Sequence, residues 1–213
     1  MSLMNLSLPI DEGPLPRDVH AFLRAAGRRI ERFQREHHIP GFVPSNFARA
    51  YWALRALAAA GAARGNLFCE WGSGFGVVAC LAAMLDFDAF GIEIEGELVD
   101  AARSLAADFR LPVEFACGSF IPGGSAACFQ GGDGFAWLTT SGGHTEEELG
   151  LGLADFDVIF AYPWPDEERV TAALFEQQAG VGAVLLTYHG ENDLRLRRKT
   201  RRRSTDRAPP RTG

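Results

Sequence analysis

The feature that most constrains the fold of this chain is an apolar strand that runs into an acid and then into three glycines at alternate positions. It reads LFCEWGSGFGVV and spans residues 67–78, with Gly72, Gly74 and Gly76 as the glycines. A strand that turns sharply into a helix needs residues that tolerate a positive φ, and glycine alone does so without steric cost. The apolar run 77–85 that follows is typical of a helix that is covered on all sides. The segment therefore predicts a strand, a turn that a ligand can approach closely, and a buried helix.

The spacing of the glycines and the acid before them discriminate between nucleotide ligands. A dinucleotide-binding fold normally uses G-x-G-x-x-G, so that a pyrophosphate lies at the amino end of the helix. Here the third glycine is Gly76, whereas that pattern would require a glycine at Val77. The carboxylate of Glu70 would repel a pyrophosphate but suits a ligand that carries an ammonium and a sulfonium group. A strand-to-helix turn that is merely rich in glycine remains as an alternative.

A second acid closes the next predicted strand. Glu93 ends the run 87–93 and lies 23 residues after Glu70. An acid about 20 residues beyond the glycine loop is placed to accept hydrogen bonds from both ribose hydroxyls of a nucleotide. Glu95 is the second candidate, although it lies where the first turn of the following helix is expected and where a helix dipole favours an acid. We therefore predict that Glu93 binds the ribose.

Residues 67–120 resemble the core of a class I S-adenosylmethionine (SAM)-dependent methyltransferase, with FCEWGSGFG as the first motif and FGIEIE as the second. The run 41–45, followed by a predicted helix at 46–60, is similar to a segment of some protein-lysine methyltransferase-like members. The resemblance implies a Rossmann-like fold, SAM as cofactor and a transferase activity. In the family, the first acid and the glycines hold the amino-acid part of SAM, and the second acid holds its ribose. The implied cofactor-binding residues are Glu70, Gly72, Ser73, Gly74, Gly76, Glu93, Ile94, Ser119 and Phe120.

A third family element follows the third predicted strand. Many relatives carry an aspartate there, after a glycine, that contacts the adenine amino group. This chain has Ser119 after Gly118. A hydroxyl can still form a hydrogen bond with the adenine, but Gly118-Ser119 can equally be a plain turn.

The run DVIFAYPWP at residues 157–165 ends the fourth predicted strand. Family members that methylate nucleobase amino groups carry an acid or amide, two prolines and an aromatic residue at this place. Here Ala161 replaces the polar group and Tyr162 the first proline, so base methylation by that route is not expected. We predict that Tyr162, Pro163 and Trp164 line the acceptor pocket, against the alternative that the prolines only end the strand.

The remaining pattern predicts an α/β fold with a doubly wound, mostly parallel sheet. After the fifth strand only 25 residues remain, too few for the antiparallel hairpin that ends the complete family fold. Residues 191–198 can supply one edge strand, so the C-terminal edge of the sheet is expected to be curtailed. The predicted strands are 67–71, 87–93, 112–116, 156–161 and 181–188, and the helices between them lie near 76–85, 97–108 and 166–179.

We divide the chain into an N-terminal helical segment (1–62) that packs on the core, a SAM-binding α/β domain (63–190) and a basic tail (191–213) that is expected to be disordered. The helical segment begins with an amphipathic pattern at residues 17–36. Residues 118–152 form an insertion with ten glycines in 35 positions, and a capping box at Thr145 predicts a short helix within it. The insertion is a candidate lid over the acceptor, with local packing of a loop as the alternative. Its most notable side chains are Phe135, Trp137 and His144.

Charge is distributed unevenly along the chain. Residues 1–190 carry 12 arginines and no lysine against 24 acids, whereas residues 191–213 carry nine basic and three acidic groups. An acidic body is unfavourable for a phosphate backbone, so nucleic acid could bind only through the basic tail. The tail is expected to be a solvated segment that adds solubility, with an electrostatic arm for nucleic acid or an acidic partner as the alternative. A protein side chain or a small molecule is the favoured methyl acceptor, although the sequence does not identify it. The tail has too little apolar content to offset the entropy of ordering.

The sequence also bears on location and metal binding. No apolar stretch approaches the roughly 20 residues that a membrane span needs. The four cysteines contain no C-x-x-C pair and are expected to be reduced thiols in a cytoplasmic protein, with no metal site. The sequence does not indicate an oligomeric state.

Methyl transfer requires little from a protein beyond alignment of the two reactants in a dry pocket. Tyr162, His144 and His189 are the titratable residues within reach of the predicted site, but none has an identifiable partner, so no catalytic base is assigned. Two alternatives remain: a SAM- or nucleotide-binding protein without turnover, and an NAD(P)-dependent oxidoreductase.

Overall fold

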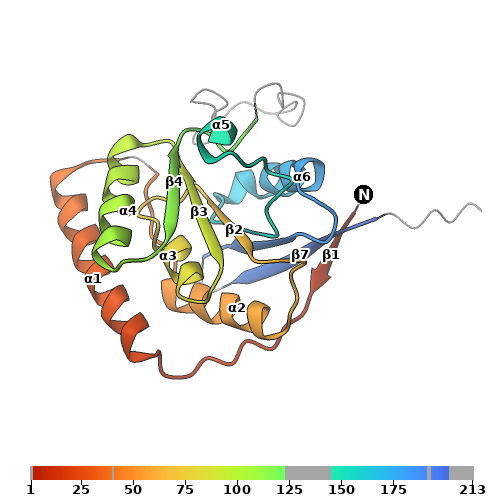
Figure 1. Cartoon of the computed structure of the whole chain (residues 1–213), viewed down its shortest axis with the longest axis horizontal. Helices are drawn as coiled ribbons and strands as arrows, with labels where there is room; N and C mark the ends of the chain where they lie inside the picture. The colour runs from red at the N-terminus through yellow and green to blue at the C-terminus, as the bar shows by residue number, and fades with distance from the viewer. Residues whose placement is uncertain (1, 40, 123–144, 191–192, 202–213) are drawn as a thin grey trace, which may run out of the picture.

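The structure is a computed structural model, and it describes residues 2–39, 41–122, 145–190 and 193–201. Figure 1 shows a twisted sheet flanked by helices. The sheet has seven strands in the order β1-β7-β6-β5-β2-β3-β4. They are β1 (Ser2–Leu6), β2 (Leu67–Trp71), β3 (Asp88–Glu93), β4 (Val113–Cys117), β5 (Val158–Ala161), β6 (Val184–Tyr188) and β7 (Leu194–Thr200). The α-helices are α1 (Arg17–Glu36), α2 (Phe47–Ala59), α3 (Val77–Ala83), α4 (Gly96–Asp108), α5 (Thr145–Leu149) and α6 (Glu168–Gln178).

The five strands from β2 to β6 are parallel to one another, which confirms the predicted doubly wound, mostly parallel sheet. From β2 the chain moves outward to β3 and β4 and then returns to β5 on the other side of β2. The order of the strands therefore reverses between β2 and β5, and ligands of such sheets bind at this switch point, outside the carboxyl ends of the strands.

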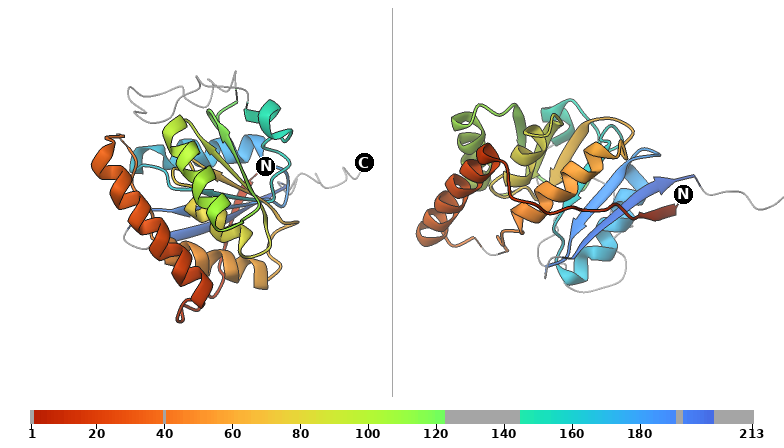
Figure 2. Two further views of the ribbon diagram at one scale, coloured as in Figure 1. Left: turned by 60° about the vertical axis from the view of Figure 1, so that its left-hand side comes forward. Right: turned by 90° about the horizontal axis from the view of Figure 1, so that it is seen from below.

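Helices cover both faces of the sheet, as the views in Figure 2 show. Helices α1 to α4 contribute to one hydrophobic cluster, which contains Phe22, Leu54 and Leu105 together with Phe68 and Phe160 of the sheet. Helix α6 packs on the opposite face, in a second cluster. Burial on both faces explains why these strands are apolar throughout rather than alternating.

The edge of the sheet that the two chain termini form has one strand more than expected. The C-terminal segment supplies one strand, β7, which is antiparallel to β6. The N-terminal segment begins with β1, a strand that the sequence did not reveal, and β1 pairs with the outer side of β7 (Figure 1). Residues from the two ends of the chain thus form the last two strands together.

The expectation of a disordered tail is wrong for residues 194–200. Leu196 is buried against the core, and Lys199 is buried with its ammonium group donating to the carbonyl of Ala179. The strand has hydrogen-bonded partners on both sides, and this pairing offsets the conformational entropy that its composition alone could not. Residues 202–213 lie outside the described part of the chain.

Candidate cofactor and acceptor site

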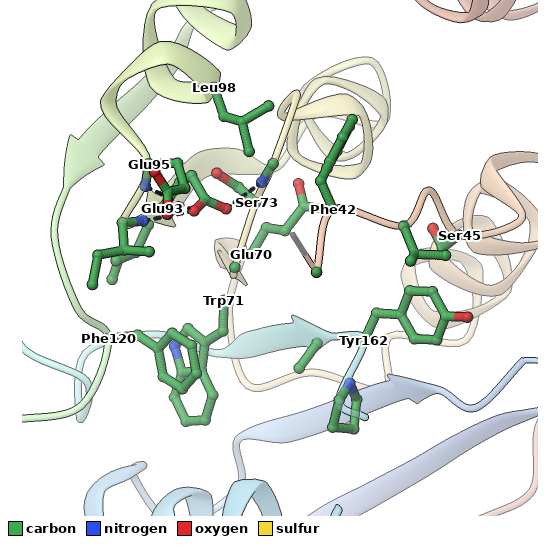
Figure 3. A pocket seen from close by; sticks show the side chains of 18 of the residues that line it. Phe42, Ser45, Glu70, Trp71, Ser73, Glu93, Glu95, Leu98, Phe120 and Tyr162 are labelled. Carbon is green, nitrogen blue, oxygen red and sulfur yellow. Dashed lines mark hydrogen bonds between the residues drawn. The ribbon is translucent and has the colours of Figure 1, made fainter. Parts of the chain in front are cut away.

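A pocket of about 470 Å³ lies at the carboxyl ends of β2, β3 and β5, where the strand order reverses. This volume is within the range of about 300–1,000 Å³ that is usual for small-molecule sites. Figure 3 shows side chains from the glycine loop, the end of β3, the turn after β5 and the segment 41–45 around it. Of the predicted site residues, the pocket brings together Glu70, Gly72, Ser73, Gly74, Glu93, Ile94, Ser119, Phe120, Tyr162, Pro163 and Trp164.

The glycine loop is bent as predicted and is fixed to the neighbouring strand. Gly72, Gly74 and Gly76 have φ values of 67°, 52° and 66°. The backbone N–H groups of Gly72 and Ser73 both donate to the carbonyl of Ile92, at 2.9 and 3.0 Å. A Cβ on Gly74 would lie 2.8 Å from the ring of Phe42, which covers the loop from the segment before α2. At Gly74 there is therefore room for the backbone only.

Gly76 serves a different purpose from the other two glycines. It is not among the pocket-lining residues but caps the amino end of α3. A Cβ at this position would overlap the ring of Phe115 and would lie 2.9 Å from the Cβ of Ala102. The structure thus places Gly76 in the packing between α3, α4 and β4 rather than against a ligand.

Glu93 is held rigidly at the end of β3. Its carboxylate accepts three backbone hydrogen bonds, from Gly74 at 2.8 Å, Ile94 at 2.7 Å and Glu95 at 3.0 Å. Burial raises the pKa of Glu93, while these three N–H donors oppose the shift. An ionised carboxylate offers about four acceptor positions, so one remains for a ligand hydroxyl. The predicted second candidate, Glu95, also lines the pocket but is exposed.

Glu70 is buried beneath the loop and has a structural contact that the sequence did not reveal. Its carboxylate accepts the N–H of Ala79 at 2.8 Å. Ala79 is the third residue of α3, so Glu70 satisfies one of the free N–H groups at the start of this helix. Burial raises the pKa of Glu70 well above its usual value, and the nearby charge of Glu93 acts in the same direction.

Ser119 and Phe120 form the part of the pocket next to β4. The hydroxyl of Ser119 accepts the N–H of Ile121 at 3.0 Å, which is the contact of a turn. Phe120 stacks on Trp71, with ring centroids 5.0 Å apart and an interplanar angle of 7° (Figure 3). No sequence signal marks Trp71 as a pocket residue, because an apolar residue at a strand end normally only contributes to a core.

The turn after β5 forms the other side of the pocket. Tyr162 packs edge to face on Tyr188 at 4.8 Å, and burial raises the pKa of its hydroxyl. Trp164 is 39 % exposed. Glu167, at the end of the 3-10 helix η2 (Pro165–Glu167), also lines the pocket although it is only 4 % exposed. No sequence signal marks Glu167 as a pocket residue, because an acid three residues after an N-cap position, here Trp164, is the usual capping acid of a helix.

Three notable side chains of the insertion lie outside the described residues, namely Phe135, Trp137 and His144. His189 is described and does not line the pocket. Its Nδ1 lies 2.7 Å from Glu168 Oε1 and its Nε2 lies 2.7 Å from the hydroxyl of Thr187, so it joins β6 to α6. His189 is therefore excluded as a group that acts in this pocket.

Comparison with known proteins addresses the fold. No protein-family model and no curated protein matches the chain. A structure of a Podospora anserina methyltransferase bound to S-adenosylhomocysteine is similar, with 13 % identity, 83 % of this chain and 64 % of that chain covered, and a TM-score of 0.51. An O-methyltransferase from Bacillus cereus matches at 15 % identity over 82 % of this chain and 66 % of its own, with a TM-score of 0.49. A methyltransferase from Geobacter sulfurreducens matches at 16 % identity over 87 % of this chain and 98 % of its own, with a TM-score of 0.48.

The chain has the Rossmann-like fold of class I methyltransferases. It spans slightly less than two thirds of the Podospora and Bacillus proteins. The Podospora protein is bound to S-adenosylhomocysteine, so the fit of such a ligand to the residues present can be tested on the pocket itself.

Two buried donors in the pocket fit a polar ligand. The hydroxyl of Ser73 and the indole N–H of Trp71 are buried, and none of the described residues forms a hydrogen bond with either. Buried polar groups are nearly always hydrogen-bonded in native proteins, so both groups are suited to a ligand. Both residues line the pocket, on either side of the turn at Gly72. Together with the carboxylates of Glu70 and Glu93, they fit a cationic nucleoside with polar substituents.

The described residues contain no group of three His, Cys, Asp or Glu side chains that could hold a metal ion. Cys69 and Cys80 are buried free thiols and Cys117 is an exposed one, while Cys128 lies outside the described part of the chain.

Proposed function

We propose that this chain is a SAM-dependent methyltransferase whose acceptor is a protein side chain or a small molecule. The observation that carries the proposal is the hydrogen bond from Gly74 to Glu93, which joins the two cofactor motifs in one pocket. The aromatic turn at residues 162–164 borders the same pocket and provides the acceptor side.

In this proposal Glu93 binds a ribose hydroxyl, and the backbone at Gly72 and Gly74 approaches the amino-acid part of SAM. Ser73 supplies a free hydroxyl to the same part. Ile94 and Phe120 provide apolar surface for the adenine, and Ser119 borders it. Glu70 stabilises the loop through its hydrogen bond to the start of α3.

SAM supplies an activated methyl group on a sulfonium, so the task left to the protein is to align an acceptor with it and to exclude water. The rings of Tyr162 and Trp164 provide an apolar wall beside the end of β5, and Phe42 covers the glycine loop from the other side. No catalytic base is assigned.

The acidic side chains that line the pocket favour an acceptor other than nucleic acid. The pocket is lined by four glutamates, and the described lining residues include no lysine, arginine or histidine. A phosphate backbone would meet repulsion here. Nucleic acid stays a partner only for the basic tail, whose residues 202–213 are not described.

We also propose a cytoplasmic location, which the buried free thiols of Cys69 and Cys80 support. No helix in the described ranges has both the length and the apolar character that crossing a bilayer requires.

Calorimetric titration with SAM, S-adenosylhomocysteine and NAD tests the proposal. We expect both sulfur ligands to bind and NAD not to bind. Binding of NAD alone would indicate an oxidoreductase instead of a methyltransferase. If SAM binds, radiolabelled SAM with fractionated cell extract tests turnover, and binding without transfer to any acceptor would favour a SAM-binding protein without activity.

A further inference from the structure

Helix α1 carries a row of arginines on its outer face. At 3.6 residues per turn, the side chains of this row fall within about 80° of the helix circumference and extend over about 27 Å along its axis. The opposite face of the helix is buried against the core, and both views of Figure 2 show α1 on the outside of the molecule. We call these residues the arginine row, and all of them are exposed: Arg17, Arg24, Arg28, Arg32 and Arg35.

The charges of the arginine row are not neutralised within the described part of the chain. No ion pair joins any arginine of the row to another described residue. Glu31 borders the row on one side without pairing with it. Arg29, which lies outside the row, pairs instead with Asp108 of α4. The row therefore presents a line of positive charge to solvent.

This line of positive charge lies in acidic surroundings. Residues 1–190 carry 12 arginines and no lysine against 24 acids, so the five arginines of the row are a large share of the basic groups of this region. Helix α4 lies beside α1, and ion pairs from Arg29 to Asp108 and from His37 to Glu97 join the two helices. Both acids are largely exposed. A partner of the row must therefore be anionic and narrow enough to avoid the acids of α4.

An acidic polypeptide segment fits these conditions better than nucleic acid does. A duplex that lay on α1 would also bring its phosphates over the acids of α4, where they are repelled. A single strand is usually held by aromatic rings on which its bases stack. Helix α1, which is described throughout, contains no tyrosine or tryptophan, and its two phenylalanines face inward, where Phe22 is buried and Phe33 packs on Phe75. Carboxylates on an extended chain need no such rings, and guanidinium groups bind them bidentately.

The arginine row leads toward the proposed active site. Ile39 and Phe42, which follow α1 closely in the chain, line the main pocket. Arg32 borders a smaller hollow of about 160 Å³ that Phe75 of the glycine loop also lines. The glutamates of the main pocket repel an acidic segment, so such a segment stays on α1. A partner held in this way has its acidic part outside the pocket and a neighbouring part of its chain near the entrance.

We propose that the arginine row binds an acidic segment of the protein that is methylated. The inference rests on the proposed function and narrows its acceptor to a protein with several aspartates or glutamates close to the modified side chain. An extended segment of about eight residues spans the row.

The test measures binding of labelled decaglutamate to the full chain by fluorescence anisotropy, without cofactor. A Gly-Ser decapeptide is the neutral probe, and a thymidine decanucleotide is the nucleic-acid probe of similar charge. The row variant combines Arg24→Gln, Arg28→Gln and Arg32→Gln. Its matched control, the tail variant, removes the same charge from the basic tail by the changes Arg201→Gln, Arg202→Gln and Arg203→Gln.

We expect decaglutamate to bind and the neutral peptide not to bind. The row variant should weaken decaglutamate binding about tenfold, as the loss of three exposed ion pairs predicts, and the tail variant should change it less than about twofold. Lysine at the same three positions of the row keeps the charge and should retain most of the affinity. Affinity for S-adenosylhomocysteine should stay within about twofold in every variant, because the row lies outside the cofactor pocket. With radiolabelled SAM and cell extract, transfer of label to protein should fall in the row variant and persist in the tail variant.

Four outcomes would overturn the proposal: no binding of decaglutamate, a larger loss in the tail variant than in the row variant, tighter binding of the decanucleotide that the row variant loses, or undiminished labelling of protein by the row variant. Failure of S-adenosylhomocysteine to bind the full chain would instead overturn the proposed function, because decaglutamate binding is measured without it.

Discussion

Gly74 donates its backbone N–H to the carboxylate of Glu93 at 2.8 Å, so the loop after β2 and the acid at the end of β3 form one hydrogen-bonded unit. The same carboxylate also accepts the N–H groups of Ile94 and Glu95. A ligand that binds Glu93 therefore contacts a group whose position three backbone donors have already fixed.

Glu93→Ala should weaken SAM binding by about 10- to 100-fold, because a ribose hydroxyl loses a charged acceptor. The domain should stay folded with a loss of about 1–3 kcal/mol, since only the N–H of Gly74 is deeply buried among the three donors. Titration calorimetry and urea unfolding measure the two effects. Glu97→Ala, which removes an exposed acid of the first turn of α4, is the control. Unchanged SAM affinity in Glu93→Ala would show that the ribose lies elsewhere.

Gly72→Ala and Gly76→Ala should distinguish a glycine that the ligand approaches from a glycine that close packing requires. Both positions have a positive φ, but a Cβ on Gly72 meets nothing within 4 Å, whereas one on Gly76 overlaps Phe115. We expect Gly76→Ala to cost about 2–5 kcal/mol of folding free energy from strain and overpacking. Gly72→Ala should cost about 1–2 kcal/mol of folding free energy but reduce SAM affinity. Denaturant unfolding measures the loss of stability in both variants, and calorimetry measures their SAM affinity. A larger loss of stability in Gly72→Ala together with a larger loss of SAM affinity in Gly76→Ala would refute the assignment of the two glycines.

The stability of the protein should depend on pH through Glu70. Burial raises its pKa in the folded state well above the unfolded value of about 4.3, so folding favours the protonated form. The stabilising contribution of this proton is complete below the unfolded pKa and is lost as the pH rises through the raised folded pKa. Glu70→Gln is neutral at every pH and keeps an acceptor for the N–H of Ala79.

Relative to Glu70→Gln, the wild-type protein should therefore lose unfolding free energy as the pH rises from about 4 toward neutrality. Urea unfolding across this range measures the difference between the two proteins. Since Glu93 is present in both, the part of its pKa shift that is due to its own burial is common to the two proteins. A pH-independent difference would show that Glu70 keeps an ordinary pKa.

Two truncations should have opposite outcomes. Removal of residues 202–213 should leave SAM affinity within about twofold, because the cofactor motifs lie in the acidic body of the chain. Removal of residues 194–213 should prevent stable folding, because β7 is the partner of both β1 and β6. Circular dichroism, thermal unfolding and calorimetry distinguish the two. A cooperative unfolding transition in the longer truncation would show that the outer strands contribute little.

Much of the cofactor side was predictable because its signals are local. The glycines after β2 mark a turn with positive φ wherever they occur, and Glu93 is identified by its distance along the chain from Glu70. The apolar runs of β2 to β6 and the amphipathic pattern of α1 likewise depend on nearest neighbours in sequence, and the structure confirms these elements within a few residues.

The sequence by itself determined the order of the strands and helices from α1 to β6, the bend after β2 and the two acids at the strand ends, since each follows from steric limits and periodicity within about 20 residues. Only the tertiary structure decided which distant residues meet. It paired Ser2 with Thr200 in β1 and β7, placed Gly76 against Phe115, and turned Glu167 into the pocket. These relationships depend on side-chain packing and cross-strand partners far apart in the chain, so no local pattern encodes them.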